Sequence, residues 1–107
     1  MRGEALKGHL DLLLLAALDP EPAHGYAIIQ QLKRRSMESF VLAEGTIYPA
    51  LHRLEAKGLI ESSWAQQDGR RRRLYRLTRQ GKNALRQKTR AWWEFAAAMN
   101  AALGEAR

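Results

Sequence analysis

The chain has 107 residues, a hydrophobic fraction of 46% and a formal net charge of +7, which fit one domain with a modest core. It contains no cysteine, so disulfides, thiolate catalysis and cysteine-ligated zinc are excluded, and a reducing cytoplasm is expected. The longest apolar run, from Leu12 to Leu18, is much shorter than the ~20 residues of a membrane span. No small-residue cleavage pattern accompanies it, so we expect neither a membrane segment nor a signal peptide.

The positive charge is concentrated in one part of the chain. Residues 66–90 contain ten Lys or Arg and a single acidic residue, Asp68, for a local charge of +9. The remainder carries eight basic and ten acidic residues. Such a field attracts polyanions, with nucleic acid as the first candidate and an anionic membrane surface as the second. A basic face that is simply solvated is the alternative.

The first third of the chain is expected to form two helices. Leucines and alanines recur at helical spacing over residues 5–18, which predicts a first helix. The segment Asp19–Pro22 should end it, because proline has no amide donor and restricts the residue before it. A second apolar stripe predicts a helix over residues 23–35, and residues 36–42 are expected to form a loop.

A third helix should run from about Gly45 to Lys57, with Gly58 as a left-handed stop. The buried stripe of this helix is expected to contain four residues, Ile47, Ala50, Leu51 and Leu54. Pro49 is expected in its first turn, where the missing amide costs little. The other side of the helix is therefore available for contacts outside the chain.

Two strands and a long helix should follow. Residues 59–65 and 72–77 have strand patterns, and Asp68-Gly69 between them is a strong hairpin-turn signal. Thr78 is expected to cap a final helix that reaches about Leu103. On this helix apolar residues recur every seven positions, which is typical of a helix that packs against another helix. The sequence therefore predicts a dimer seam on the final helix.

The order helix, helix, helix, strand, turn, strand predicts a mainly α, α+β fold: a winged helix-turn-helix with a two-stranded wing and a long C-terminal helix. We expect residues 1–78 to form a winged-helix DNA-binding domain and residues 79–107 a C-terminal dimerisation helix. In such modules the third helix enters the major groove and the hairpin lies near a minor groove or the phosphate backbone. The candidate DNA-binding residues are Thr46, Tyr48, Pro49, His52 and Arg53 on the helix, and Gly69, Arg70, Arg71, Arg72 and Arg73 in the wing.

Some of these residues have a purely structural alternative. Tyr48 could be a half-buried anchor of its helix, and His52 an ordinary surface histidine. Because side chains alternate along a strand, only part of the arginine run can face a duplex, and we favour Arg70 and Arg72. The cations at 33–35 either touch phosphates or complement the dipole of the helix that they end.

The residues also resemble a known family. The segments Glu44-Gly45-Thr46-Ile47-Tyr48-Pro49, Leu51-x-x-Leu54-Glu55-x-x-Gly58-Leu59-Ile60 and Gly69-Arg70-x-Arg72-Arg73-x-Tyr75-x-Leu77-Thr78-x-x-Gly81 are similar to motifs of the PadR family of bacterial transcriptional regulators. His24-Gly25-Tyr26 agrees with them, and the resemblance covers about residues 7–103. The chain departs from the family at two positions. Family members frequently have proline at the position of Arg71 and a second tyrosine at the position of Leu74. The resemblance implies a homodimeric repressor that binds a palindromic promoter operator and blocks polymerase.

The single C-terminal helix resembles the short subfamily, whose members dimerise through that helix together with the N-terminal helix. The resemblance implies a seam made by Leu10, Leu14, Leu85, Trp92, Phe95, Ala96, Met99 and Leu103. Some members resemble multidrug sensors that hold flat aromatic compounds between tryptophans at the dimer interface. Trp92 and Trp93 are the corresponding candidates for an effector pocket, and ordinary seam packing is the alternative.

No catalytic constellation is present in the sequence. It has no phosphate-binding loop of the type G-x-x-x-x-G-K-S/T, no H-E-x-x-H and no serine in a strand-to-helix elbow, so we expect no enzymatic activity and no cofactor. His9 and His24 lack metal-ligand spacing, so no metal site is predicted. A winged-helix adaptor that binds proteins without specific DNA binding is the remaining alternative, although it does not need a basic wing. The expected location is the cytoplasm, at the nucleoid.

Overall fold

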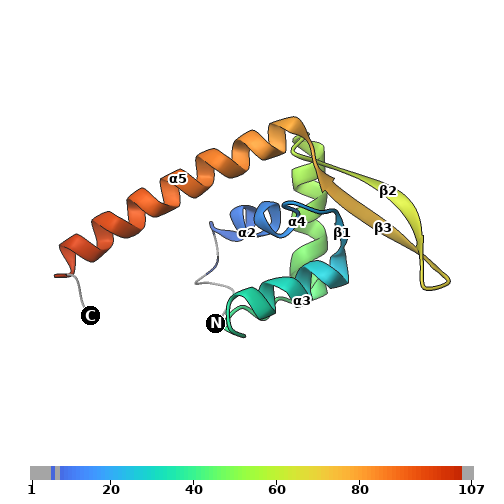
Figure 1. The fold of residues 1–107 in the computed structure, drawn as a ribbon, viewed down its shortest axis with the longest axis horizontal. Coiled ribbons are helices and arrows are strands. Elements are labelled where there is room, and N and C mark those ends of the chain that lie inside the picture. The colour runs from blue at the N-terminus through green and yellow to red at the C-terminus, as the bar shows by residue number, and fades with distance from the viewer. Residues whose placement is uncertain (1–5, 7, 105–107) are drawn as a thin grey trace.

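The computed structural model describes Leu6 and residues 8–104, so the outermost residues of both expected domains, 1–5, 7 and 105–107, lie outside it. The elements in chain order are α2 (Leu10–Ala17), β1 (Ala23–His24), α3 (Gly25–Arg35), α4 (Glu44–Ala56), β2 (Ile60–Gln67), β3 (Arg70–Leu77) and α5 (Arg79–Ala102). α5 and the β2–β3 hairpin extend from the helical body in opposite directions (Figure 1). The molecule is therefore elongated, with extents of 53 × 28 × 21 Å.

The sheet has three antiparallel strands in the order β1-β3-β2. β2 and β3 pair along their whole length, from Ile60 opposite Leu77 to Gln67 opposite Arg70. β1 pairs with the base of β3, where Ala23 lies opposite Tyr75. The prediction that the second helix starts at Ala23 was wrong, because Ala23 and His24 form β1 and α3 begins at Gly25. A strand of two residues has no periodicity of its own and depends on pairing with the backbone of β3.

The first helix is also shorter than predicted. Residues 8 and 9 form a turn, in which Gly8 has φ +91°, and α2 begins only at Leu10. The left-handed conformation of Gly8 interrupts the predicted helix, and glycine adopts it readily because it carries no β-carbon. Leu6 lies before this turn and is buried in the core.

α4 confirms the predicted third helix, with one correction at Pro49. Because α4 begins at Glu44, Pro49 is its sixth residue and lies in the second turn, not the first. Without an amide hydrogen, Pro49 cannot donate to the carbonyl of Gly45 one turn earlier. Both residues are exposed, so solvent is available to that carbonyl.

The start of α5 is fixed closely to the rest of the fold. The Thr78 hydroxyl accepts a hydrogen bond from the Gly81 amide at 3.0 Å and donates one to the Gly58 carbonyl at 2.7 Å, which confirms the predicted N-cap. Gly58 has φ +79°, as the predicted left-handed stop requires. A β-carbon at Gly81 would overlap the carbonyl oxygen of Leu59, so only glycine fits here.

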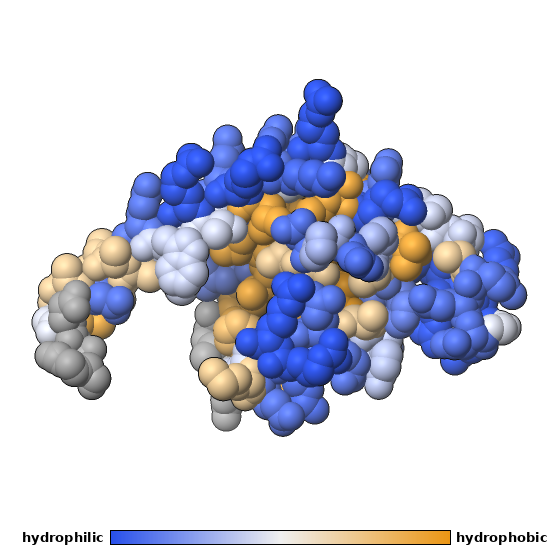
Figure 2. Space-filling view, in the orientation of Figure 1, coloured by the Kyte–Doolittle hydropathy of each residue, from blue (hydrophilic) through white to orange (hydrophobic). Residues whose placement is uncertain are grey.

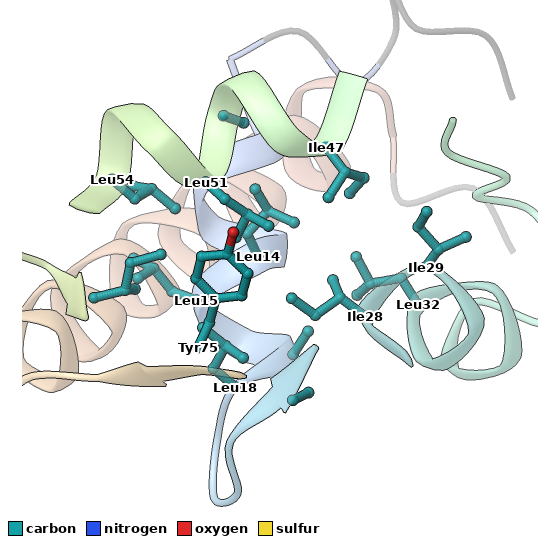
Figure 3. Close-up of a cluster of buried hydrophobic side chains, with 14 of the residues drawn as sticks. Leu14, Leu15, Leu18, Ile28, Ile29, Leu32, Ile47, Leu51, Leu54 and Tyr75 are labelled. Carbon is teal, nitrogen blue, oxygen red and sulfur yellow. The ribbon is translucent and has the colours of Figure 1, made fainter. Parts of the chain in front are cut away.

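The core lies between α2, α3, α4 and the base of the sheet (Figure 3). Its largest fully buried side chains are Leu14, Leu15, Leu18, Ile28, Ile47, Leu51, Leu54 and Ile60. Tyr75 of β3 is 2% exposed and points among them. Burial, helped by the nearby Glu55 carboxylate, raises the pKa of the Tyr75 phenol. The core thus holds α4 with one side against α2 and α3 and leaves the other side uncovered.

Candidate nucleic-acid interface

The outer side of α4 is the first candidate surface. The buried side consists of the four residues predicted from the sequence, Ile47, Ala50, Leu51 and Leu54. The opposite side leaves four predicted contact residues exposed: Thr46, Pro49, His52 and Arg53. Hydroxyl, imidazole and guanidinium groups on an open helix face can donate hydrogen bonds to base edges and phosphates in a major groove.

Tyr48 lies differently from its neighbours on α4. It is half-buried, packs against the core and lies directly against Gly25 at the start of α3. A β-carbon on residue 25 would overlap the Tyr48 hydroxyl and ring, so Gly25 is required there. The space beside Gly25 is thus filled by a side chain of α4. Tyr48 is therefore at least an anchor between α3 and α4.

α3 is held at both ends by side-chain hydrogen bonds. The His24 Nδ1 accepts from the Ala27 amide at 3.3 Å and caps the N-terminus. Burial lowers the pKa of His24, the positive charge of Arg72 lowers it further, and Asp68 acts in the opposite direction. At the other end, Arg35 donates to the Ala16 carbonyl at 3.1 Å. At least this cation of the 33–35 cluster therefore joins α3 to α2.

The strands of the wing extend closer to the turn than predicted. Asp68 and Gly69 have φ +53° and +75°, the left-handed pair that a two-residue type I′ turn needs. This confirms the predicted turn. Pairing continues to Gln67 and Arg70, next to the turn, so the arginine run belongs to β3 and not to the loop. The arginines are therefore fixed by strand geometry.

Strand alternation divides the arginines into two pairs. Arg70 and Arg72 lie on one face of the hairpin, and Arg71 and Arg73 lie on the other face, which continues into the core at Tyr75. Arg72 is half-buried, and the other three are exposed. The two pairs therefore have different surroundings although their sequence is uniform.

Sequence reasoning missed the surroundings of Arg71 and Arg73. Both guanidinium groups lie over the ring of Trp64, with their carbon atoms 4.7 Å and 5.1 Å from the ring centroid. From the sequence, Trp64 is simply one residue of the strand predicted over residues 59–65. The available signal was the alternation itself, because Trp64 and the arginines two strand positions apart must share a face once Asp68-Gly69 sets the register.

The distal half of α5 leaves an apolar stripe uncovered. Trp92, Phe95, Met99 and Leu103 are 37%, 53%, 43% and 70% exposed. Figure 2 shows apolar side chains over the end of α5, beyond the basic part of the helix. The stripe follows the seven-residue spacing that the sequence predicts, and Ala96 within it is half-buried.

The remaining predicted seam residues lie nearer the body. Leu10 and Leu85 are half-buried and pack against the core. Leu14 is fully buried inside the chain itself. Its side chain is therefore part of the core and presents no surface to a second copy.

An open hollow of about 270 Å³ lies beside Trp92. Its lining residues come from the start of α2 and from α5: Gly8, His9, Leu12, Lys88, Ala91, Trp92 and Phe95. The rings of His9 and Trp92 meet edge to face, with centroids 5.3 Å apart. Trp93 is 65% exposed and does not line the hollow, because successive helix positions are about 100° apart. The structure thus separates the two tryptophans.

Within the part of the chain that the structure describes, no group of three or more His, Cys, Asp or Glu side chains is placed to hold a metal ion. None of its helices is both long and apolar enough to cross a membrane.

Three helices packed on a small antiparallel sheet, with α4 uncovered beside a projecting hairpin, define a winged helix-turn-helix, and the predicted α+β fold class is confirmed. The chain belongs to the PadR family: the model of the transcriptional regulator PadR-like family matches residues 14–87. A transcriptional regulator of Mycobacterium tuberculosis is 44% identical over 84 residues, which are 78% of this chain and 75% of that protein.

Solved structures agree with the family assignment. A PadR family transcription regulator from Clostridium difficile superposes with a TM-score of 0.79 at 38% identity, covering 91% of this chain and 100% of that one. A transcriptional regulator from Clostridium thermocellum has a TM-score of 0.82 at 30% identity, with 92% and 96% of the chains covered. The chain is therefore a transcriptional regulator of the PadR family, and the relatives named above are regulators, not enzymes.

Proposed function

We propose that this regulator is a homodimeric repressor that binds an inverted-repeat operator in double-stranded DNA, in the cytoplasm at the nucleoid. One observation carries the proposal: the same core holds both the open side of α4 and the arginine-bearing wing in position. A helix that reads a major groove and a hairpin that follows phosphates have to be fixed relative to each other.

Sequence preference is assigned to α4. Thr46, Pro49, His52 and Arg53 are exposed on its open side, and Tyr48 sets the position of the front of the helix against α3. Arg53 is the group best suited to bidentate contact with a guanine edge. Because base contacts specify and phosphate contacts position, changes at Arg53 should alter which operator is preferred.

Affinity is assigned mainly to the wing. Gly69 forms the turn that brings β3 back, and Arg70, Arg71, Arg72 and Arg73 follow it. Each phosphate neutralised by a cation releases counterions, so removal of one contacting arginine should reduce the salt dependence of binding by about one unit of slope.

Dimerisation is assigned to residues 79–107, through the uncovered stripe of Trp92, Phe95, Ala96, Met99 and Leu103. Large exposed apolar side chains at seven-residue spacing are stabilised when a second helix covers them. A two-fold dimer presents two copies of α4 to half-sites about one or two helical turns apart, which requires an inverted repeat. Occupation of that operator would block polymerase.

An aromatic small-molecule effector is assigned to the Trp92 hollow, which already has an aromatic and an imidazole wall. In the dimer a flat compound there would change the distance between the two α4 helices. Trp93 takes part only if the partner copy approaches its exposed ring. Titration of the protein with planar aromatic compounds, followed by tryptophan fluorescence, tests this assignment.

The central experiment is a gel-shift and fluorescence-anisotropy titration with the DNA upstream of the gene, at several salt concentrations. We expect a saturable shift that weakens steeply as salt increases, and a changed ranking of operator variants for Arg53→Ala. An absent or salt-independent shift would contradict the proposal and favour a protein-binding adaptor. Sedimentation of Trp92→Ala should show more monomer than the wild type.

A further inference from the structure

Trp64 is an exposed tryptophan in an exposed hairpin. It lies in the middle of β2 and is 56% exposed, although a ring of this size is normally covered. The guanidinium groups of Arg71 and Arg73 cover part of the ring, with their Cζ atoms 4.7 Å and 5.1 Å from its centroid. These are cation–π distances, and the ring therefore restricts two otherwise flexible cations.

The register explains why these two arginines and not the others are held. Trp64 lies directly opposite Arg73, and Arg71 lies opposite Gln66, two positions nearer the turn on the same face. Arg70 and Arg72 lie on the other face, opposite Gln67 and Ala65. The ring thus selects one pair out of four chemically identical side chains.

Arg73 is also joined to α4 by two hydrogen bonds in series. Its Nε donates to the Ser62 hydroxyl at 2.9 Å, and that hydroxyl donates to the Glu55 carboxylate at 2.8 Å. Glu55 follows the exposed Arg53 by two residues on α4. The wing face that carries Trp64 is therefore tied to the helix assigned to the major groove.

We infer that Trp64 is a positioning residue that holds Arg71 and Arg73 on the α4 side of the wing, ready to contact phosphates flanking the bases read by α4. This inference rests on the proposed function. A guanidinium stacked through its plane still has free N–H groups at its edge for a phosphate. Because the ring already orders both cations, and Ser62 also holds Arg73, less conformational entropy is lost when DNA binds.

Arg71 and Arg73 should therefore contribute more to DNA affinity than Arg70 and Arg72, and two matched double variants test this. Arg71→Ala/Arg73→Ala and Arg70→Ala/Arg72→Ala each remove two positive charges from the same strand. Anisotropy with one labelled operator should show a loss of affinity several-fold larger for the first double variant. Equal losses, or a larger loss for the second, would overturn the inference.

Substitution of Trp64 itself gives the second arm. Trp64→Ala should weaken operator binding by about tenfold, and Trp64→Phe, which retains an aromatic face, should recover most of it. Trp64→Ala should also leave the secondary structure seen by far-UV circular dichroism unchanged, because the ring lies outside the core. Wild-type affinity in Trp64→Ala, or no recovery in Trp64→Phe, would contradict a positioning role.

A measurement without DNA separates this inference from the proposed function. In the free protein, NMR relaxation should show a more restricted guanidinium group for Arg71, which lies over the ring but does not share the Arg73–Ser62 hydrogen bond, than for Arg70. Trp64→Ala should remove this difference. If the wild type bound no DNA, the proposed function would fail whatever the NMR result. If DNA bound normally but the Arg71 and Arg70 groups were equally mobile, only the inference about Trp64 would fail.

Discussion

The winged-helix body and the distal half of α5 are built from the same kind of apolar periodicity but end in opposite states. In the body, Leu51 and Ile47 are fully buried among residues of the same chain. On α5, Phe95 and Met99 are 53% and 43% exposed. An amphipathic stripe thus shows that a surface is apolar, whereas only the fold shows whether the chain itself covers it.

The largest effect is expected in the body. Leu51→Ala should lower the free energy of unfolding by about 2–5 kcal/mol, because it removes a fully buried side chain and leaves a cavity. Urea denaturation at one fixed protein concentration, low enough that the proposed dimer is dissociated, measures this change. The matched control is Leu103→Ala on α5, where the same truncation removes a side chain that is 70% exposed.

Leu103→Ala should cost much less than Leu51→Ala in the same assay. Similar losses for the two leucine variants would mean that both regions are equally buried in solution. The comparison between body and distal helix would then not hold.

The next effect concerns association and not folding. Phe95→Ala should weaken the proposed dimer by roughly 30-fold, since covering the exposed half of the ring contributes about 1 kcal/mol in each copy. Analytical ultracentrifugation over a range of concentrations measures the dissociation constant. Trp93→Ala is the control, because this equally aromatic position lies beside the stripe and should leave the dimer intact. If the Trp93→Ala dimer dissociated and the Phe95→Ala dimer did not, the seam would lie on another face of α5.

A smaller effect is expected at the junction of the two regions. Thr78→Ala removes the cap of α5 and the hydrogen bond to the Gly58 carbonyl, and should lower the free energy of unfolding by about 1 kcal/mol. Thr78→Ser retains the hydroxyl and should stay close to the wild type. Equal destabilisation by both variants would show that the methyl group, and not the cap, holds α5 to the body.

Much of the body could be predicted from the sequence because its signals are local. The stripe from Ile47 to Leu54, the turn at Asp68-Gly69 and the cap at Thr78 each depend on a few neighbouring residues, and the structure confirms them. β1 was missed because its two residues become a strand only through pairing with β3. Gly8 shortened the first helix because its left-handed turn is a property of the fold and not of the apolar pattern.

The candidate site was predictable in composition but not in geometry. The sequence identifies the arginine run and its alternation, but the contact of Arg71 and Arg73 with the Trp64 ring depends on the pairing of β2 with β3. It identifies Tyr48, but the contact with Gly25 joins elements that are far apart in the chain. It also cannot show that Leu14, which shares the helical pattern of the seam residues, faces the core. Long-range packing decides all three.

The smallest effect is expected from pH, and it acts at the wing end of the body. His24 caps α3 through a neutral Nδ1, which cannot accept the Ala27 amide once it is protonated. Because burial and Arg72 lower the pKa of His24 below its ordinary value near 6.5, the unfolded chain binds this proton more readily than the folded one. The contribution of the His24 cap to the free energy of unfolding is therefore complete above about pH 6.5. It is lost as the pH falls through the lower pKa that His24 has in the folded state.

His24→Asn isolates this contribution, because asparagine caps a helix without titrating near neutral pH. Urea midpoints measured at pH 7.5 and at pH 5.5 should fall more for the wild type than for His24→Asn, since all other titrating groups are shared. Parallel pH profiles would mean that the cap tolerates protonation. In that case the body, like the distal helix, would depend on packing and not on the charge state of this histidine.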